Sequence, residues 1–251
     1  MKVAEGVPLS RIIARQLIES PEIVVRGASR SIAAEKFRRL KTLLENDPDG
    51  AAQVIVVTSS TPQEGKSLVA LNLALAFASD RNTETLIVDA DLRRPTQEKW
   101  VSPPPSLGLS DLLSGRADLE HTVMRFKDTT LEMLPAGHPP EDPVELLASD
   151  ACRTIVAALR KRYRRVIIDT PPIVPFTDAD VVARYADGVL LVVRSGRTPK
   201  LVFAQAASTV TSTRILGVVL NDVTANLADR GHHYGRYYHT YYNRDGEGKK
   251  P

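Results

Sequence analysis

The chain has 251 residues, with 33 lysines and arginines against 30 aspartates and glutamates, which gives a formal net charge of +3. So small an imbalance excludes the uniform positive field that would by itself indicate nucleic-acid binding. A domain of this length can fold without disulfides, and its one cysteine, Cys152, favours a reducing compartment and a buried position. The longest apolar run falls well short of the roughly 20 residues that a membrane-spanning helix needs.

The N-terminal part is expected to form an arm and then a helix. Residues 1–30, interrupted by prolines and glycines, predict a loosely attached arm with a short helix near residues 10–20. From Ser31, apolar residues recur at helical spacing as far as Leu44, while lysines and arginines fill other faces. We therefore expect an amphipathic helix with a basic side, ending before Asn46.

Short β-branched runs then alternate with helical stretches. Near-continuous apolar runs are typical of strands that are covered on both faces, and intervening helices provide the crossovers of a parallel sheet. The pattern predicts a doubly wound α/β fold with a mostly parallel sheet, in a single domain over residues 31–225. Two proline-rich segments within it are expected to be surface loops. The predicted strands lie at residues 53–58, 84–90, 164–170, 188–193 and 215–220.

The apolar pattern stops near residue 225, and residues 226–251 have the composition of a disordered tail. This tail holds five of the seven tyrosines in the chain, next to several arginines and histidines. Phenols placed where no core can bury them indicate either modification or aromatic stacking on a single-stranded nucleic acid, and we favour modification. The five are Tyr234, Tyr237, Tyr238, Tyr241 and Tyr242.

The segment TSSTPQEGKS lies between a predicted strand and a predicted helix. A Gly-Lys-Ser turn at such a junction surrounds a phosphate with backbone N–H groups, directs Lys66 to the outer phosphates and offers the Ser67 hydroxyl to Mg²⁺. Ser60 stands where the usual first glycine would be, so a solvated helix start is the alternative for this segment alone. The predicted ATP-binding residues here are Ser60, Thr61, Pro62, Gln63, Glu64, Gly65, Lys66, Ser67 and Leu68.

Three aspartates follow predicted parallel strands: Asp89 and Asp91 after one strand, and Asp169 after another. Any one of them alone is more often a helix cap, but the carboxyl ends of parallel strands meet at one edge, where α/β sheets bind ligands. Mg²⁺ prefers oxygen ligands shared among carboxylates, hydroxyls, water and phosphates. Ser67, Asp169 and one of the Asp89/Asp91 pair could supply them.

These segments together resemble the bacterial protein-tyrosine kinases, or BY-kinases, of capsule and exopolysaccharide assembly. The resemblance rests on the altered phosphate loop, LIVDADLRRP, VIIDTPP, GLSDLLSG, DGVLLVVRSGRT and the tyrosine-rich tail, all in the same order. It covers roughly residues 23–221 plus the tail, and it implies a P-loop NTPase fold with ATP and Mg²⁺ as cofactors.

The resemblance also implies a role for each matching residue. Lys66 would contact the β- and γ-phosphates, and Ser67 would bind Mg²⁺. Asp169 would hold the metal or its water, with Asp91 supporting the metal shell. Asp89 would orient the incoming tyrosine and accept its proton late in the reaction. The tail tyrosines would be the phosphoacceptors.

Two further positions match the family in part. Its Glu-x-x-Arg-x-x-Arg helix motif, which is implicated in ring assembly, appears as Glu35, Arg38 and Lys41. Lysine cannot replace the bidentate arginine fork, so a homo-oligomeric interface and a solvated basic helix face both remain open. Asn221 resembles the adenine-side asparagine of related P-loop ATPases, although a turn residue at a strand end explains it almost as well.

Kinases of this kind imply further partners: a membrane-spanning chain-length protein that activates them, and a cognate tyrosine phosphatase. They act in the cytoplasm at the inner face of the plasma membrane, and no nucleic acid partner is expected. The alternative is a switch ATPase similar to ParA or MinD, without kinase activity. Such ATPases carry a signature lysine five residues before the lysine of the Gly-Lys pair, where this chain has Thr61.

Overall fold

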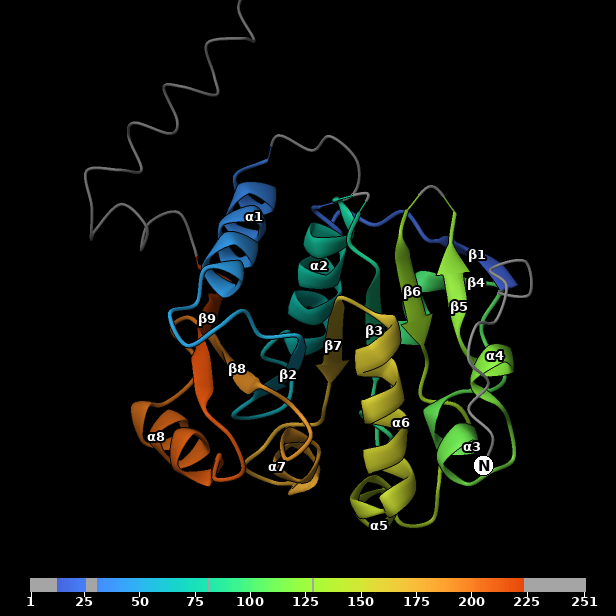
Figure 1. Ribbon diagram of the computed structural model, residues 1–251. Coiled ribbons are helices and arrows are strands. Elements are labelled where there is room, and N and C mark those ends of the chain that lie inside the picture. Colours follow the sequence, from blue (N-terminus) through green and yellow to red (C-terminus); the bar gives the residue numbers. More distant parts are fainter. Residues whose placement is uncertain (1–12, 26–30, 81, 128, 224–251) are drawn as a thin grey trace, which may run out of the picture.

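The computed structural model describes residues 13–25, 31–80, 82–127 and 129–223, and it contains a nine-stranded sheet (Figure 1). The strands are β1 (Ile13–Leu17), β2 (Val54–Ser59), β3 (Thr85–Asp89), β4 (Val101–Ser102), β5 (Met124–Phe126), β6 (Leu131–Leu134), β7 (Arg165–Asp169), β8 (Gly188–Arg194) and β9 (Ile215–Asn221). Their order is β4-β1-β5-β6-β3-β7-β2-β8-β9, which Figure 1 shows running from β4 and β1 at the right to β9 at the left.

The strands from β6 to β9 in this order form a continuous parallel array. Only the pairs β5–β6 and β1–β4 run antiparallel within the described residues. The five strands predicted from the apolar runs are β2, β3, β7, β8 and β9, so the predicted α/β class and mostly parallel sheet are confirmed. Because β2, β3 and β7 are adjacent, the segments that follow them meet at one edge of the sheet.

Helices cover both faces of the sheet, since alternate residues of the central strands point into two separate cores. One core joins Val54, Val56, Val166 and Ile168 to the later helices, and the other joins the intervening strand residues to α1 and α2. The helices are α1 (Ile32–Glu45), α2 (Lys66–Ala78), α3 (Leu109–Leu113), α4 (Leu119–Thr122), α5 (Pro143–Ala148), α6 (Asp150–Arg162), α7 (Asp178–Ala183) and α8 (Lys200–Thr209), with a 3-10 turn, η2 (Gln97–Trp100).

The predicted amphipathic helix is confirmed as α1, which begins after Ser31 and ends before Asn46. The Ser31 side chain caps it by accepting the N–H of Ala34 at 3.1 Å, which satisfies one donor that the first turn leaves unpaired. Cys152 is buried, and burial raises the pKa of its thiol to about 12. This cysteine is therefore an inert core residue, as the sequence predicted.

The prediction for the N-terminal segment is wrong where the structure describes it. Ile13–Leu17 is strand β1, not a helix, because parallel pairing with β5 and antiparallel pairing with β4 satisfy its backbone. Ile23 and Val25 are buried in the core, and the side chain of Asn72 accepts the Val25 N–H at 3.3 Å. Residues 13–25 are thus part of the folded domain and do not form the loosely attached arm that the sequence predicted.

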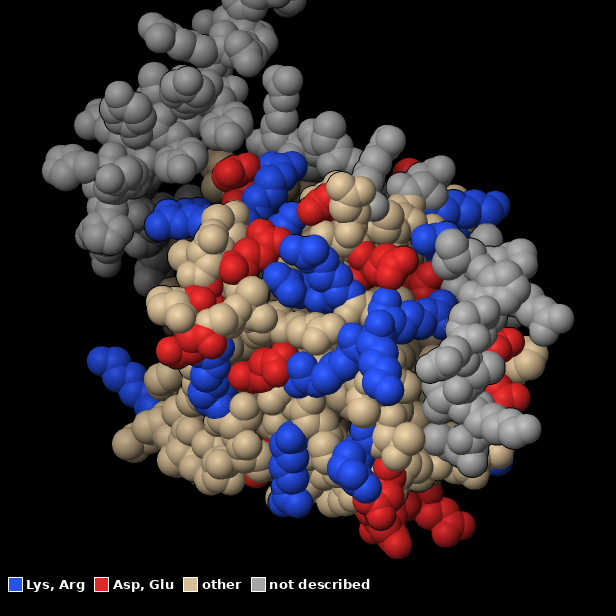
Figure 2. All heavy atoms as spheres, in the orientation of Figure 1, with Lys and Arg blue, Asp and Glu red and all other residues tan. Residues whose placement is uncertain are grey.

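Basic and acidic side chains are interspersed over the face of the molecule seen in Figure 2. None of the helices in the described ranges combines the length and apolarity needed to cross a bilayer. The predicted tail, residues 226–251, and its five tyrosines lie outside the described residues.

Candidate active site

The phosphate loop connects β2 to α2, as the sequence predicted, and its shape depends on Gly65. This residue has a φ of +86°, a left-handed conformation that glycine adopts at low cost. A Cβ added to it would lie 2.1 Å from Nδ2 of Asn221, so the close approach of Asn221 also requires glycine. That Nδ2 donates to the carbonyl oxygen of Glu64 at 3.0 Å, which places Asn221 against the loop backbone.

Four of the predicted site residues meet around one ammonium group. Lys66 Nζ lies 2.7 Å from Oδ2 of Asp91, 3.4 Å from Oδ1 of Asp169 and 3.1 Å from Oγ of Ser67. The parallel arrangement of β3, β7 and β2 brings these groups together across 103 residues of sequence between Lys66 and Asp169. The three acceptor oxygens therefore converge on a single cation.

Asp89 lies at the same edge but is fully buried, and backbone groups hold it. Its Oδ1 accepts the N–H of Asp91 at 3.1 Å, and its Oδ2 accepts those of Thr96 and Gln97 at 3.1 and 3.0 Å. In this structure Asp89 shapes the turn after β3. Oδ1 keeps a second lone pair, because a carboxylate has about four acceptor positions.

Gln97 is a site residue that the sequence did not indicate. Its Nε2 donates to the Ser67 carbonyl oxygen and to Oδ2 of Asp169, at 2.9 Å each, so it links the start of α2 to the end of β7. The segment RRPTQEKW contains no motif that would single out this glutamine. Only the fold brings it next to residues 30 and 72 positions away in the chain.

Burial and excess negative charge set the electrostatics of this cluster. Burial, with repulsion from Asp169, raises the pKa of Asp89 to about 8, against hydrogen bonding and the charge of Lys66. Burial also raises the pKa of Asp169, although Lys66, Ser67 and Gln97 act in the opposite direction. For Lys66, burial lowers the pKa, but Asp169 and Asp91 outweigh it, and the net shift is upward. Lys66 therefore stays charged at neutral pH.

The residues present fit a hydrated Mg²⁺ ion. Three oxygens of the kinds that Mg²⁺ binds already surround one positive charge, and Mg²⁺ usually takes only one or two carboxylates, with water and phosphates completing its shell. Two buried polar atoms nearby, Oγ of Ser60 and Oε1 of Gln97, have no partner among the described residues. Buried polar atoms are normally satisfied, so these two suit a polar ligand. A preformed cage of three or more His, Cys, Asp or Glu is absent from the described ranges.

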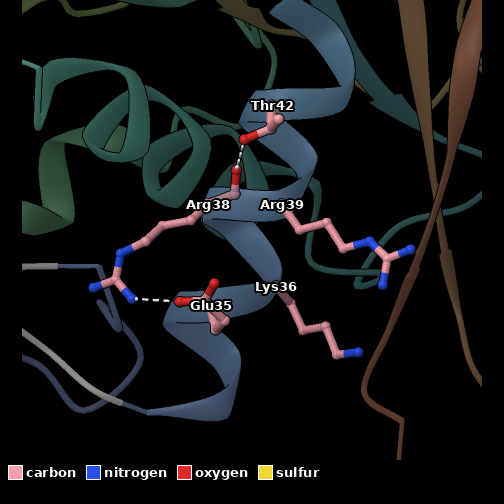
Figure 3. Close-up of a pocket in the computed structure, with 5 residues that line it drawn as sticks. All are labelled: Glu35, Lys36, Arg38, Arg39 and Thr42. Carbon is pink, nitrogen blue, oxygen red and sulfur yellow. Dashed lines mark hydrogen bonds and ion pairs between the residues drawn. The ribbon is translucent and has the colours of Figure 1, made fainter. Parts of the chain in front are cut away.

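The predicted oligomerisation residues Glu35, Arg38 and Lys41 lie on α1. Two of them, Glu35 and Arg38, line a hollow together with Lys36, Arg39 and Thr42 (Figure 3). Arg38 donates to Oε2 of Glu35 at 2.9 Å, and Lys41 lies 3.9 Å from Oε1 of Glu45. Figure 3 shows Lys36 and Arg39 pointing to the side of α1 opposite to Arg38. The Glu35–Arg38 pair thus stabilises the helix itself, and its role between subunits stays a prediction.

The two tyrosines within the described residues both pack against the folded core. Tyr163 is buried, and its hydroxyl donates to Oε2 of Glu132 at 2.5 Å. Burial and the Glu132 charge raise the Tyr163 pKa well above its ordinary value. Tyr185 is partly buried against the core. Tyr163 is therefore shielded from solvent, whereas Tyr185 is only partly covered.

No protein-family model matches the chain. Several known proteins and solved structures are nevertheless similar to it over most of its length. Tyrosine-protein kinase YwqD of Bacillus subtilis is 31% identical, over 85% of this chain and 91% of that protein. Succinoglycan biosynthesis transport protein ExoP of Rhizobium meliloti is 33% identical over 86% of this chain, which spans only 29% of the length of ExoP. The crystal structure of the chimerical protein CapA2B2 matches with a TM-score of 0.78 at 35% identity, covering 84% of this chain and 94% of that one.

Proposed function

The chain belongs to the bacterial protein-tyrosine kinases, and from this premise we propose that it uses Mg-ATP to phosphorylate its own C-terminal tyrosines. The observation that carries this proposal is the contact of Lys66 with Ser67, Asp91 and Asp169 at the carboxyl edge of the sheet. A charged lysine, a hydroxyl and two carboxylates at a strand-to-helix turn are the groups that phosphoryl transfer requires.

Nucleotide binding requires Lys66 to change partners. In this structure the Lys66 ammonium offsets the negative charge of Asp91 and Asp169. A Mg²⁺ ion bound with the nucleotide would offset the same charge in its place. Ser67, Asp91 and Asp169 would hold that ion, whose chemistry is to neutralise charge on the phosphate oxygens. Lys66 would then turn to the β- and γ-phosphates, beside the backbone N–H groups at the start of α2.

The acceptor for the phenol proton is Asp89. A tyrosine pKa is about 10, so an ordinary carboxylate near 4 faces a mismatch of roughly six pKa units, or about 8 kcal/mol. Burial raises the pKa of Asp89, which narrows this mismatch. Asp89 still accepts the proton late, which suits a loose transition state that depends mainly on positioning and charge.

In the proposed transfer, every bond and proton is accounted for by these groups. The phenol oxygen bonds to the γ-phosphorus as the bond between that phosphorus and the bridging oxygen breaks, and ADP leaves with that bonding pair. The phenol proton passes to Asp89. Lys66 stabilises the charge that develops on the phosphate oxygens, because it stays protonated throughout the neutral range.

The proposed acceptors are Tyr234 to Tyr242, which lie outside the described residues. An extended chain from Asn221 to Tyr238 reaches on the order of 50 Å, enough for the site of the same subunit or a neighbouring one. Each phosphate adds nearly two negative charges, so several of them would reverse the charge of this basic segment. Reversal would release the tail from an acidic or nucleotide-bearing surface.

In the cell, we propose that this autokinase regulates polymerisation and export of an exopolysaccharide or capsule. The names of its relatives support this role, since ExoP is a succinoglycan biosynthesis transport protein. The proposed partners are a membrane-spanning activator, which would hold the kinase at the inner face of the plasma membrane, and a cognate phosphatase. Self-association through Glu35, Arg38 and Lys41 belongs to the same proposal.

The test compares phosphotyrosine after incubation with Mg-ATP in three proteins: wild type, a variant with all five tail tyrosines changed to phenylalanine, and Tyr185→Phe as the matched control. We expect mass spectrometry to find phosphotyrosine in the wild type and in Tyr185→Phe, and none in the tail variant. Phosphotyrosine that persists in the tail variant would refute the assignment of the acceptors.

A further inference from the structure

The phosphate loop contains a buried negative charge where an anionic ligand is expected. The side chain of Glu64 immediately precedes Gly65 and Lys66, and only 3% of this residue is exposed. A carboxylate free to turn toward the phosphates would repel them. The loop must therefore hold Glu64 in a fixed direction.

Two donors hold this carboxylate. Its Oε2 accepts the N–H of Thr61 at 2.9 Å, within the loop, and its Oε1 accepts the hydroxyl of Thr198, from the turn between β8 and α8. The Thr198 oxygen in turn accepts the N–H of Arg194 at 2.9 Å, which fixes the direction of its own proton. The carboxylate is thus tied both to its own loop and to the neighbouring strand.

Arg194 supports the same loop from a second side. Its Nη1 donates to the carbonyl oxygen of Gln63 at 3.3 Å, and its Nε lies 2.8 Å from Oδ2 of Asp222. Gln63 has a φ of +65°, which residues other than glycine rarely adopt, so this part of the loop needs outside support. Asp222 directly follows the last strand, so Arg194 connects the phosphate loop to the segment that leads into the tail.

We propose that Thr198 and Arg194 are positioning residues for nucleotide binding, because they keep the charge of Glu64 turned away from the phosphates and hold the loop in its binding shape. The inference rests on the proposed use of Mg-ATP, and it adds two residues outside the phosphate loop that support the affinity of the loop for the nucleotide. Within the described residues, neither side chain bonds to Lys66 or to the three groups around it, so both act on ligand binding more than on the transfer step.

The test measures Mg-ADP binding by titration calorimetry, which requires no phosphoryl transfer. Thr198→Val removes the hydroxyl with little change in size, and we expect affinity to fall about tenfold or more, since hydrogen bonds to charged groups are strong. Thr198→Ser keeps the hydroxyl and should bind within about twofold of wild type. Thr209→Val is the matched control, because the hydroxyl that it removes donates to the helix carbonyl of Gln205.

A double variant separates charge from general damage to the fold. Because Glu64→Gln removes the repelling charge, Thr198→Val combined with Glu64→Gln should recover most of the affinity that Thr198→Val loses. With a tyrosine peptide as substrate, Thr198→Val should raise the KM for ATP while kcat stays within about threefold. If Thr198→Val does not fold, Arg194→Gln must show the same loss of affinity.

Wild-type affinity in Thr198→Val, or an equal loss in Thr198→Ser, would overturn the inference while leaving the kinase assignment intact. The absence of rescue in the double variant would also overturn it. A wild-type protein that takes up no Mg-ADP would overturn the inference and the proposed function together.

Discussion

Asp89 and Asp187 lie at opposite edges of the central parallel strands, and their surroundings shift their pKa values in opposite directions. At the carboxyl edge, burial raises the pKa of Asp89 to about 8. At the amino edge, burial acts on Asp187 in the same sense, but hydrogen bonds from Arg160 and from the N–H groups of Val54 and Gln53 outweigh it and lower the pKa.

The difference lies in the balance between charges and donors. Asp187 receives two backbone N–H groups at 2.8 Å and an arginine fork at 2.7 and 3.0 Å, so one carboxylate has four donors. At the other edge, Asp89, Asp91 and Asp169 share one ammonium. Structural sites satisfy their charge, whereas sites that keep a surplus are candidates for binding and catalysis. The contrast points to the carboxyl edge as the reactive one.

Removing the single cation of the carboxyl edge should have the largest effect. We expect Lys66→Met to lower kcat for tail phosphorylation by about 10²–10³-fold or more, because Lys66 stabilises charge in the transition state. The measurement is the initial rate of phosphotyrosine formation with Mg-ATP. Lys161→Met, an exposed lysine of α6, is the control and should retain full activity. Equal rates in wild type and Lys66→Met would place the chemistry elsewhere.

The raised pKa of Asp89 should appear in the pH dependence of the reaction. Asp89 must be ionised to accept a proton, and a raised pKa means that the ionised fraction falls as the pH drops below about 8. We expect kcat/KM for ATP, which reports the free enzyme, to rise about tenfold from pH 6 to 7 and to level off above 8. A profile already flat at pH 6 would show that Asp89 titrates as an ordinary aspartate.

At the amino edge, the expected effect is on stability. Asp187→Asn should lower the free energy of unfolding by about 1–3 kcal/mol at pH 7, because four donors in partly buried hydrogen bonds lose a charged acceptor. The pKa of Asp187 is lowered, so its contribution exists above the unfolded value near 3.9 and disappears as the pH falls through the folded value. Urea unfolding at pH 7 and at pH 3 should therefore show a difference that shrinks on acidification. Asp150→Asn, an exposed carboxylate, is the control.

The smallest change in the free energy of unfolding is expected for a variant of Arg153, which lies on α6 as Arg160 does. Arg153 pairs with Asp150 at 2.9 Å, but both side chains are largely exposed, so solvent screens the pair. Arg153→Ala should change the free energy of unfolding by less than about 0.5 kcal/mol in the same urea experiment. A loss comparable to that of Asp187→Asn would mean that exposure does not distinguish the two ion pairs.

The sequence predicted β2, β3, β7, β8 and β9 but missed the short strands on the other side of β3, for a physical reason. Strands covered on both faces need continuous apolar runs, which β2, β3, β7 and β8 have. Strands β4, β5 and β6 are two to four residues long, and β6 contains the buried Glu132. That charge is tolerated because Tyr163 and Arg162 donate to it, and such partners cannot be read from a local pattern.

The candidate site was predictable to the same extent. Lys66 and Ser67 belong to a recognisable sequence motif at the start of α2, and the three aspartates lie at or just after the ends of β3 and β7. Their proximity therefore follows from the parallel sheet. Gln97 carries no motif and reaches the site only through the turn after β3. The ion pair of Lys66 with Asp91 could not be predicted from the sequence. It forms because the fold places several buried carboxylates around one lysine.

A crystal structure with Mg-ADP bound tests the central claim most directly. We expect the phosphates against the backbone of residues 60–67, the metal held by Ser67 with Asp91 or Asp169, and Lys66 Nζ moved from Asp91 to the β-phosphate. A nucleotide bound away from this loop, or Lys66 still paired with both aspartates beside a bound nucleotide, would contradict the account.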